Sequence, residues 1–243
     1  MLVEACIDSI ASAEAAERGG ARRLELCGAL YDGGITPSAG MIGLVRERVA
    51  VPLFVIVRPR GGGFVYTEDE ILVILRDIAI ARELGVDGIV VGALARRGGV
   101  DVTRICAMVH AAAPLPVTFH RAVDLVADQR RALDDLAHAG VQRVLTSGGA
   151  MTAIAGADRI RELVTHAAGR LTVMAGGAIR EAHVSELIRR SGVTEIHVRG
   201  TRLTTTSPGV PKIVLRKPLP SDENAWEETD EARIRDVVRL ANA

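Results

Sequence analysis

Aromatic residues are scarce in this chain of 243 residues, which has one Trp, two Tyr and three Phe. So few rings exclude the aromatic platforms on which single-stranded nucleic acids stack. Lysine plus arginine and aspartate plus glutamate both number 30, so the formal net charge is zero. A neutral chain lacks the long-range positive field that attracts nucleic acids or anionic membranes. We therefore expect neither nucleic acid nor membrane as a partner.

Long apolar runs and a secretory signal are also missing. No run reaches the roughly 18 apolar residues of a membrane-spanning helix. The first apolar segment, Leu2–Ile7, contains Glu4 and has no basic residues before it, unlike a signal peptide. Cysteine occurs three times, and this small odd number fits a reducing compartment better than a disulfide framework. The sequence therefore predicts a cytoplasmic protein.

A short apolar run, a polar or glycine-rich corner and a helix-like stretch recur about eight times along the chain. The apolar runs are Leu2–Cys6, Arg23–Cys27, Leu53–Val57, Gly88–Val91, Pro116–Phe119, Arg143–Leu145, Leu171–Ala175 and Glu195–Val198. Eight units in this length give about 30 residues per unit, the size of a βαβ repeat. The pattern predicts an α/β fold, a single (β/α)8 TIM barrel over residues 1–243, whose site lies at the carboxyl ends of its strands.

The last part of the chain differs from the regular repeat. Residues of about 204–228 contain four prolines, so we expect an irregular connection there, with Lys212–Leu215 as a candidate short strand. A final helix is expected over Asp230–Ala241. The helix before the last strand is expected to run from Glu181 to Gly192, which would place its N-terminus close to the seventh strand.

Alternation along the first three strands separates chemically active side chains from apolar ones. The active side chains that share one parity are Glu4 and Cys6, Glu25 and Cys27, and Arg58 and Arg60. The residues between them are mostly apolar and suit contact with helices, so the active set should point into the barrel. Because buried charge needs a partner, we predict a network of Glu4, Glu25 and the two arginines. The alternative is that this network only neutralises itself and holds the strands in register.

Two histidines lie in or just after later strands. His120 follows the fifth strand, and His197 lies within the eighth. Either could bind a substrate or transfer protons, and Glu25 or His120 is the candidate general base. Each histidine could equally be a hydrogen-bonded residue of a polar barrel interior.

Glycine-rich corners follow the last two barrel strands. Gly176 and Gly177 follow the seventh strand, and Gly200 and Thr201 follow the eighth. Barrels commonly bind phosphate with these two loops, and glycine lets an anion approach the backbone amides. We therefore predict an anion-binding site at these four residues. The alternative is that the glycines serve tight turns alone.

Several segments together resemble one family, the CutC family. They are Glu4–Ser9, Gly19–Cys27, Gly33–Ser38, Ile56–Gly62, Gly88–Leu94, Phe119–Ala122 and Leu145–Gly149. The resemblance runs collinearly over about residues 1–200, and Thr204 onward lacks the usual family pattern. It implies a cytoplasmic (β/α)8 barrel, often a homo-oligomer, with a role in copper homeostasis. It also implies that Cys6 and Cys27 are Cu(I) ligands.

Two functions remain open on the sequence, with an inert oligomeric scaffold as a third. The first is Cu(I) binding, because Cys6 and Cys27 share the inward parity on neighbouring strands and soft thiolates suit Cu(I). The alternative is that these are small buried residues that fill the barrel. The second function is an enzyme or sensor for a small phosphorylated or carboxylated metabolite at the carboxyl face. Cys106, on the fourth helix, is expected to serve packing.

Overall fold

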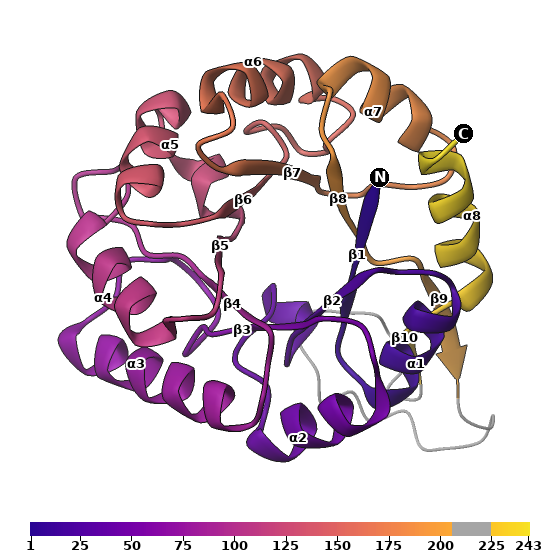
Figure 1. The fold of residues 1–243 in the computed structure, drawn as a ribbon, viewed down its shortest axis with the longest axis horizontal. Coiled ribbons are helices and arrows are strands. Elements are labelled where there is room, and N and C mark those ends of the chain that lie inside the picture. Colours follow the sequence, from indigo (N-terminus) through magenta and orange to yellow (C-terminus); the bar gives the residue numbers. More distant parts are fainter. Residues whose placement is uncertain (206–224) are drawn as a thin grey trace.

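A barrel of eight parallel strands forms the centre of the molecule (Figure 1). A computed structural model describes residues 1–205 and 225–243. The barrel strands are β1 (Leu2–Ile7), β2 (Arg23–Leu26), β3 (Leu53–Ile56), β4 (Gly88–Val91), β5 (Val117–Phe119), β6 (Arg143–Thr146), β7 (Thr172–Gly176) and β8 (Glu195–Val198). Neighbours in the chain pair with one another, and β8 pairs with β1 to close the barrel. The eightfold repeat thus correctly predicted the (β/α)8 fold.

Helices surround this barrel. They are α1 (Ile10–Arg18), α2 (Ala39–Arg48), α3 (Glu68–Glu83), α4 (Val102–Ala112), α5 (Gln129–His138), α6 (Ala157–Ala167), α7 (Val184–Ser191) and α8 (Glu231–Ala241), with short 3-10 turns at Leu30–Asp32 and Arg121–Leu125. A polar side chain accepts a hydrogen bond from the first turn of six of these helices. The capping residues are Ser9, Ser38, Thr67, Asp101, Asp128 and Asp230.

The strand alternation divides the buried side chains into two groups. Val3, Ala5 and Leu24 belong to the large core between strands and helices. Cys6 and Cys27 belong to a separate small cluster inside the barrel, together with apolar residues of β3 and β4. Successive strand residues therefore face the helices and the interior in turn, as the alternation predicted.

Helix α7 begins three residues later than the sequence suggested. The amides of His183 and Val184 both bond to the carbonyl of Arg180, so residues 181–183 form a turn rather than helix. The predicted N-terminus near Glu181 was therefore wrong. The loop after β7 is correspondingly longer.

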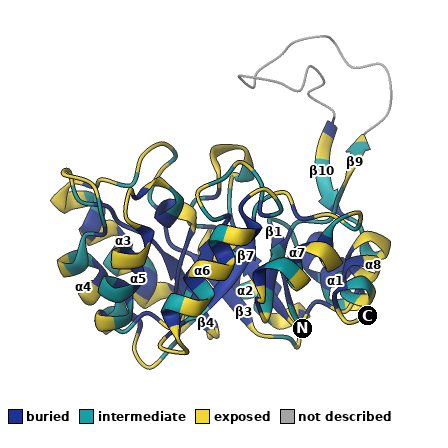
Figure 2. Cartoon of the chain, turned by 90° about the horizontal axis from the view of Figure 1, so that it is seen from above, coloured by how far each residue is buried: buried dark blue, intermediate teal, exposed yellow. Residues whose placement is uncertain are grey.

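The segment expected to be irregular is paired at both of its ends. β9 (Thr201–Thr205) and β10 (Ala225–Thr229) form an antiparallel ribbon that projects from the carboxyl end of the barrel (Figure 2). The expectation of an irregular connection over about 204–228 was wrong at residues 204–205 and 225–228, because threonine favours strands and the four prolines all fall between the two paired segments. The candidate strand Lys212–Leu215 lies outside the described residues. None of the helices in residues 1–205 and 225–243 is long and apolar enough to cross a membrane.

Candidate functional site at the carboxyl end of the barrel

A layer of buried ion pairs lies deep in the barrel, below the site. Arg23 pairs with Glu4 through Nε and with Glu195 through Nη2, the latter at 2.6 Å. Arg143 also pairs with Glu195, at 2.5 Å. These contacts offset the cost of burying the charges and link strands β1, β2, β6 and β8. Charge neutralisation within this layer is therefore structural.

The arginines of this layer are not the ones predicted from the sequence. Arg58 is buried, but it donates to backbone carbonyls and holds the loops around it. Its acceptors are the carbonyls of Asp32, Gly34 and Gly62. Arg60 lies in an exposed loop and pairs with Glu70 at 2.5 Å. The predicted network of Arg58 and Arg60 with the interior carboxylates was therefore wrong, because β3 ends at Ile56 and both arginines belong to the following loop.

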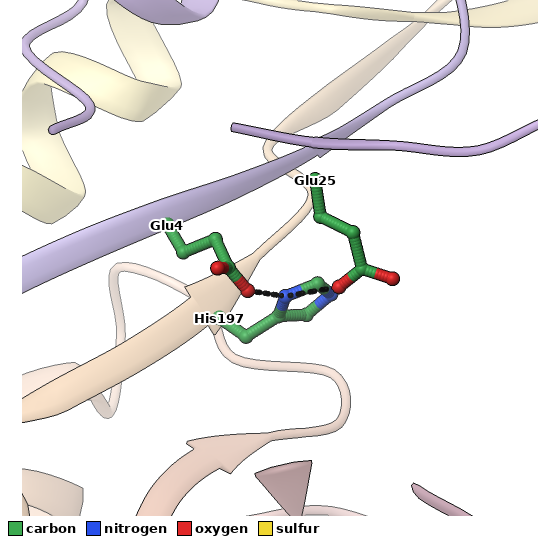
Figure 3. A group of neighbouring side chains, drawn as sticks. All are labelled: Glu4, Glu25 and His197. Atoms are coloured by element: carbon green, nitrogen blue, oxygen red, sulfur yellow. Dashed lines mark hydrogen bonds and ion pairs between the residues drawn. The ribbon is translucent and has the colours of Figure 1, made fainter. Parts of the chain in front are cut away.

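Glu4, a member of this layer, also meets Glu25 and His197 (Figure 3). The register places Glu4 beside His197. The Nδ1 atom of His197 lies 2.7 Å from Glu4 Oε1 and 3.4 Å from Glu25 Oε2. Burial raises the pKa of Glu4, but the hydrogen bond with His197 and the charge of Arg23 outweigh burial and lower it to about 2. Burial disfavours charged His197, yet Cys6 and Glu4 raise its pKa well above the usual value. Glu4 and His197 therefore form a buried ion pair at neutral pH.

The two thiols complete this cluster. Cys6 Sγ lies 3.8 Å from Cys27 Sγ, and Cys27 Sγ lies 3.6 Å from Glu25 Oε1. The hydrogen bond from Cys27 outweighs burial and, with the help of His197, lowers the pKa of Cys6 to about 5. Burial and the charge of Cys6 outweigh the opposing charge of His197 and raise the pKa of Glu25 to about 8. The hydrogen bond with Cys6 and burial raise the pKa of Cys27 well above its usual value.

These pKa values indicate a specific set of protonation states at neutral pH. Cys6 is a thiolate, whereas Cys27 and Glu25 retain their protons. His197 supplies the positive charge beside the thiolate. Cys106 is exposed on α4, so the expectation that it serves packing was wrong.

His120 faces the same interior from the loop after β5. Its Nδ1 accepts a hydrogen bond from the amide of Ala122 at 3.2 Å, and its ring lies 4.8 Å from that of Phe64. Burial, together with the charge of Arg58, lowers the pKa of His120 to about 3. Its Nε2 is buried and has no hydrogen-bond partner among the described residues. His120 is therefore neutral and offers one unused polar atom to a ligand.

Cys6, Cys27, Glu25, Arg58, His120 and His197 all line one cavity. Its volume is about 140 Å³, and Arg121 and the ring of Phe64 complete its wall near His120. The structure thus brings together the predicted metal-ligating and catalytic side chains except Arg60, whereas Glu4 belongs to the ion-pair layer.

A second and larger pocket lies at the loops after β7 and β8. Its volume is about 310 Å³, and Cys6 and His197 line both this pocket and the cavity. Of the four predicted anion-binding residues, Gly177, Gly200 and Thr201 line it. Gly176 does not: it ends β7, and a Cβ there would lie 2.5 Å from Leu145 Cδ1.

Four arginines around this pocket were not among the predicted site residues. They are Arg121, Arg180, Arg199 and Arg233. Three of them adjoin motifs that the sequence analysis singled out, since they follow His120 or flank the glycine corners. Arg233 belongs to α8, and only the closed barrel brings that helix beside the loop after β7.

Comparison with known proteins gives one consistent family. A model of the CutC family matches residues 1–202. A copper homeostasis protein cutC homolog of Homo sapiens is 41% identical over 242 residues, which is 99% of this chain and 89% of that protein. A family protein CutC of Xanthomonas axonopodis pv. citri is 42% identical over 238 residues, 98% of each chain.

Solved structures agree with this result. The CutC structure from Streptococcus agalactiae has a TM-score of 0.77 and 31% identity, covering 81% of this chain and 97% of that one. A phosphoribosylanthranilate isomerase from Thermotoga maritima has a TM-score of 0.60 at 13% identity, covering 100% and 98%, and shares the fold alone. Because the family model matches most of the chain and relatives above 40% identity span nearly all of it, this protein belongs to the CutC family.

Proposed function

We propose that this CutC family member takes part in copper homeostasis by binding Cu(I) through Cys6 and Cys27. The observation that carries the proposal is the 3.8 Å separation of two buried thiol sulfur atoms from neighbouring strands. Relatives named as copper homeostasis proteins support the biological setting.

The donor set fits a soft monovalent ion. Thiolates are the ligands that Cu(I) prefers. With metal–sulfur bonds of about 2.3 Å, as in zinc thiolate sites, one ion can join two sulfur atoms separated by up to about 4.6 Å. The sulfur atoms of Cys6 and Cys27 lie within this span. Cys6 is already a thiolate at neutral pH, so binding requires the loss of one proton, from Cys27.

The oxygen and nitrogen donors beside the thiols are less suited to a hard divalent ion. Glu4, Glu25 and His197 have ligand atoms within 4.8 Å of one another. However, the two oxygens of Glu4 already contact Arg23 and His197, and Glu25 retains a proton. A divalent ion would have to displace these partners. The sulfur atoms are therefore the donors that remain accessible to a metal.

An anaerobic Cu(I) titration against a chromophoric Cu(I) chelator tests the proposal. The wild type should bind one Cu(I) per chain, and either Cys6→Ser or Cys27→Ser should abolish binding. Cys106→Ser is the matched control, because this thiol is exposed on α4 and far from the cluster in the fold. Unchanged stoichiometry in the Cys6→Ser/Cys27→Ser variant would overturn the proposal.

The proposed setting is a cytoplasmic homo-oligomer. A reducing cytoplasm keeps Cys6 and Cys27 as thiols able to bind Cu(I). Self-association is supported by Leu72 and Val73, neighbouring apolar side chains of α3 that are 64% and 48% exposed. Sedimentation velocity measures the assembly state, and a monomer at high concentration would contradict this part of the proposal.

A further inference from the structure

We infer that the pocket between the loops after β7 and β8 binds a small anionic metabolite, with its phosphate or carboxylate group held by arginines and its other end over Cys6 and His197. We call it the arginine pocket: the 310 Å³ space lined by Arg121, Arg180, Arg199, Arg233 and the Gly177 and Gly200 loops. This binding does not depend on Cu(I), so it extends beyond the proposed function.

The charges around the arginine pocket favour an anion. Arg121 pairs with Asp124 at 2.8 Å, and Arg199 pairs with Glu227 at 2.6 Å. Arg180 and Arg233 are both exposed, and their guanidinium groups form no ion pair or hydrogen bond with any described residue of the chain. Glu181, which also lines the pocket, opposes them with a single negative charge. Two free guanidinium groups against one carboxylate leave an excess of positive charge that an oxyanion would neutralise.

One of the arginines that line the pocket has a buried donor without a partner among the described residues. Nε of Arg199 is buried and has no hydrogen-bond partner within residues 1–205 and 225–243. Leaving such a donor unpaired is costly, and native structures usually satisfy it. The Nη1 atom of the same side chain contacts Glu227, which fixes the guanidinium at the pocket wall. A ligand oxygen is a suitable acceptor for the remaining N–H.

The loop after β7 also presents its backbone. The amides of Gly177, Ala178 and Ile179 donate no hydrogen bond to any described residue. The backbone has φ +117° at Gly177 and φ +52° at Ala178. Residues that carry a Cβ rarely adopt such positive φ values. A Cβ at Gly177 would lie 3.2 Å from Ser147 Cβ and 3.4 Å from Arg121 Cζ. Successive free amides in such a loop form a concave site for an anion.

Gly200 has a different reason to be glycine. A Cβ there would lie 2.6 Å from Cδ1 of Ile234 on α8, so this residue allows the helix to pack closely. That packing also brings Arg233, the residue before Ile234, to the pocket. The loop after β8 therefore contributes by positioning α8, whereas the loop after β7 contributes its amides.

The residues at the floor of the arginine pocket determine which chemical groups the rest of the ligand can carry. Cys6 and His197 line it and continue into the smaller cavity, where Nε2 of His120 has no partner among the described residues. A ligand anchored at the arginines would thus reach the sulfur atom of Cys6 and the ring of His197 with its second end. The ligand class is a small molecule with a terminal oxyanion and a short polar body.

Isothermal titration calorimetry with three probes tests the site: inorganic phosphate, glycerol 3-phosphate and succinate. We expect at least one phosphate or carboxylate probe to bind the wild type. Arg180→Gln and Arg233→Gln should each weaken binding by about tenfold, the loss expected for one charge-assisted contact. Arg235→Gln is the matched control, because this arginine lies on the same helix and pairs with Glu231 outside the pocket. The probe that binds identifies the oxyanion.

Two results would overturn the inference. The first is that the wild type binds none of the probes at about 10 mM, a concentration at which even a ligand with a millimolar dissociation constant would bind measurably. The other is an equal loss of affinity in Arg235→Gln. The Cys27→Ser variant separates this site from the copper site, since Cys27 does not line the arginine pocket. It should lose Cu(I) binding and keep the anion.

The position of the ligand's second end has its own test. In a Cys106→Ser background, the bound probe should slow alkylation of Cys6 by iodoacetamide, and Arg233→Gln should abolish this protection. Tryptic mass spectrometry follows modification of Cys6 separately from Cys27. An unchanged alkylation rate at saturating probe would show that the ligand does not cover Cys6 and would overturn this orientation.

Discussion

Glu4 on β1 and His197 on β8 lie side by side in the strand pair that closes the barrel. A 2.7 Å hydrogen bond joins their side chains. The same carboxylate pairs with Arg23 on β2. One buried residue therefore ties together three strands from the two ends of the chain. It also orients the histidine that faces the thiols.

Replacing Glu4 with Gln should destabilise the protein strongly. The change removes an anionic partner from Arg23 and the hydrogen-bonded carboxylate from His197. Breaking a buried pair from one side costs roughly 3–5 kcal/mol. Urea denaturation followed by circular dichroism measures the loss. Glu231→Gln, which removes an exposed partner of Arg18, is the control and should leave the midpoint unchanged. A Glu4→Gln midpoint equal to that of the wild type would contradict a role in stability.

The dependence of the free energy of unfolding on pH should also show the contribution of Glu4 at acidic pH. Its pKa is lowered from an ordinary 4.5 to about 2, mainly because His197 and Arg23 outweigh the effect of burial. A lowered pKa in the folded state contributes stability that is present above pH 4.5 and lost as the pH falls towards 2. The wild type should therefore lose stability steeply over this range. Glu4→Gln should show a shallower slope, and parallel slopes would assign the acid sensitivity to other groups.

The sequence was informative about which side chains face the interior. Alternation placed Glu4, Cys6, Glu25 and Cys27 there because strand periodicity needs no knowledge of the partner strand. It could not give the register, which depends on where each strand starts relative to its neighbour. The structure pairs Cys6 with Glu25, so Cys27 lies two residues further along.

The positions of other site residues could not be predicted from strand alternation. Arg143 is the first residue of β6 and meets Glu195 across the barrel, a contact between strands that are not neighbours. Arg233 reaches the pocket from a helix that follows the ribbon. Arg58 was misplaced because alternation was extended past the end of its strand into a loop. For Arg143 and Arg233 a long-range packing relationship decided the position, and local patterns carry no signal for it.

Adding one methyl group at Gly92 should displace His120. A Cβ at this position would overlap the imidazole ring, which is itself fixed by the hydrogen bond from Ala122. Overpacking of a filled interior typically costs about 1–3 kcal/mol, so Gly92→Ala should lower the free energy of unfolding by this amount. Gly40→Ala is the control, because nothing lies within 4 Å of a Cβ there and α2 should tolerate or favour alanine. Chemical denaturation gives both values, and equal effects would contradict the close approach of Gly92 to His120.

Cys6 and Cys27 should remain reduced in the folded protein under mild oxidation, although their sulfur atoms lie 3.8 Å apart. The register offset of two residues places their α-carbons at a diagonal of about 8 Å, from a strand spacing of about 4.8 Å and a rise of about 3.3 Å per residue. Disulfides need α-carbons closer than about 7 Å, and the closed barrel resists the shift that would bring these strands into line.

Folded protein treated with oxidised glutathione should therefore keep both thiols, as counted by mass spectrometry after alkylation in denaturant. Protein oxidised while unfolded in urea is the control, since the free chain can join the same cysteines. Rapid formation of a Cys6–Cys27 disulfide in the folded state would contradict the register and would favour redox chemistry over metal binding at this pair.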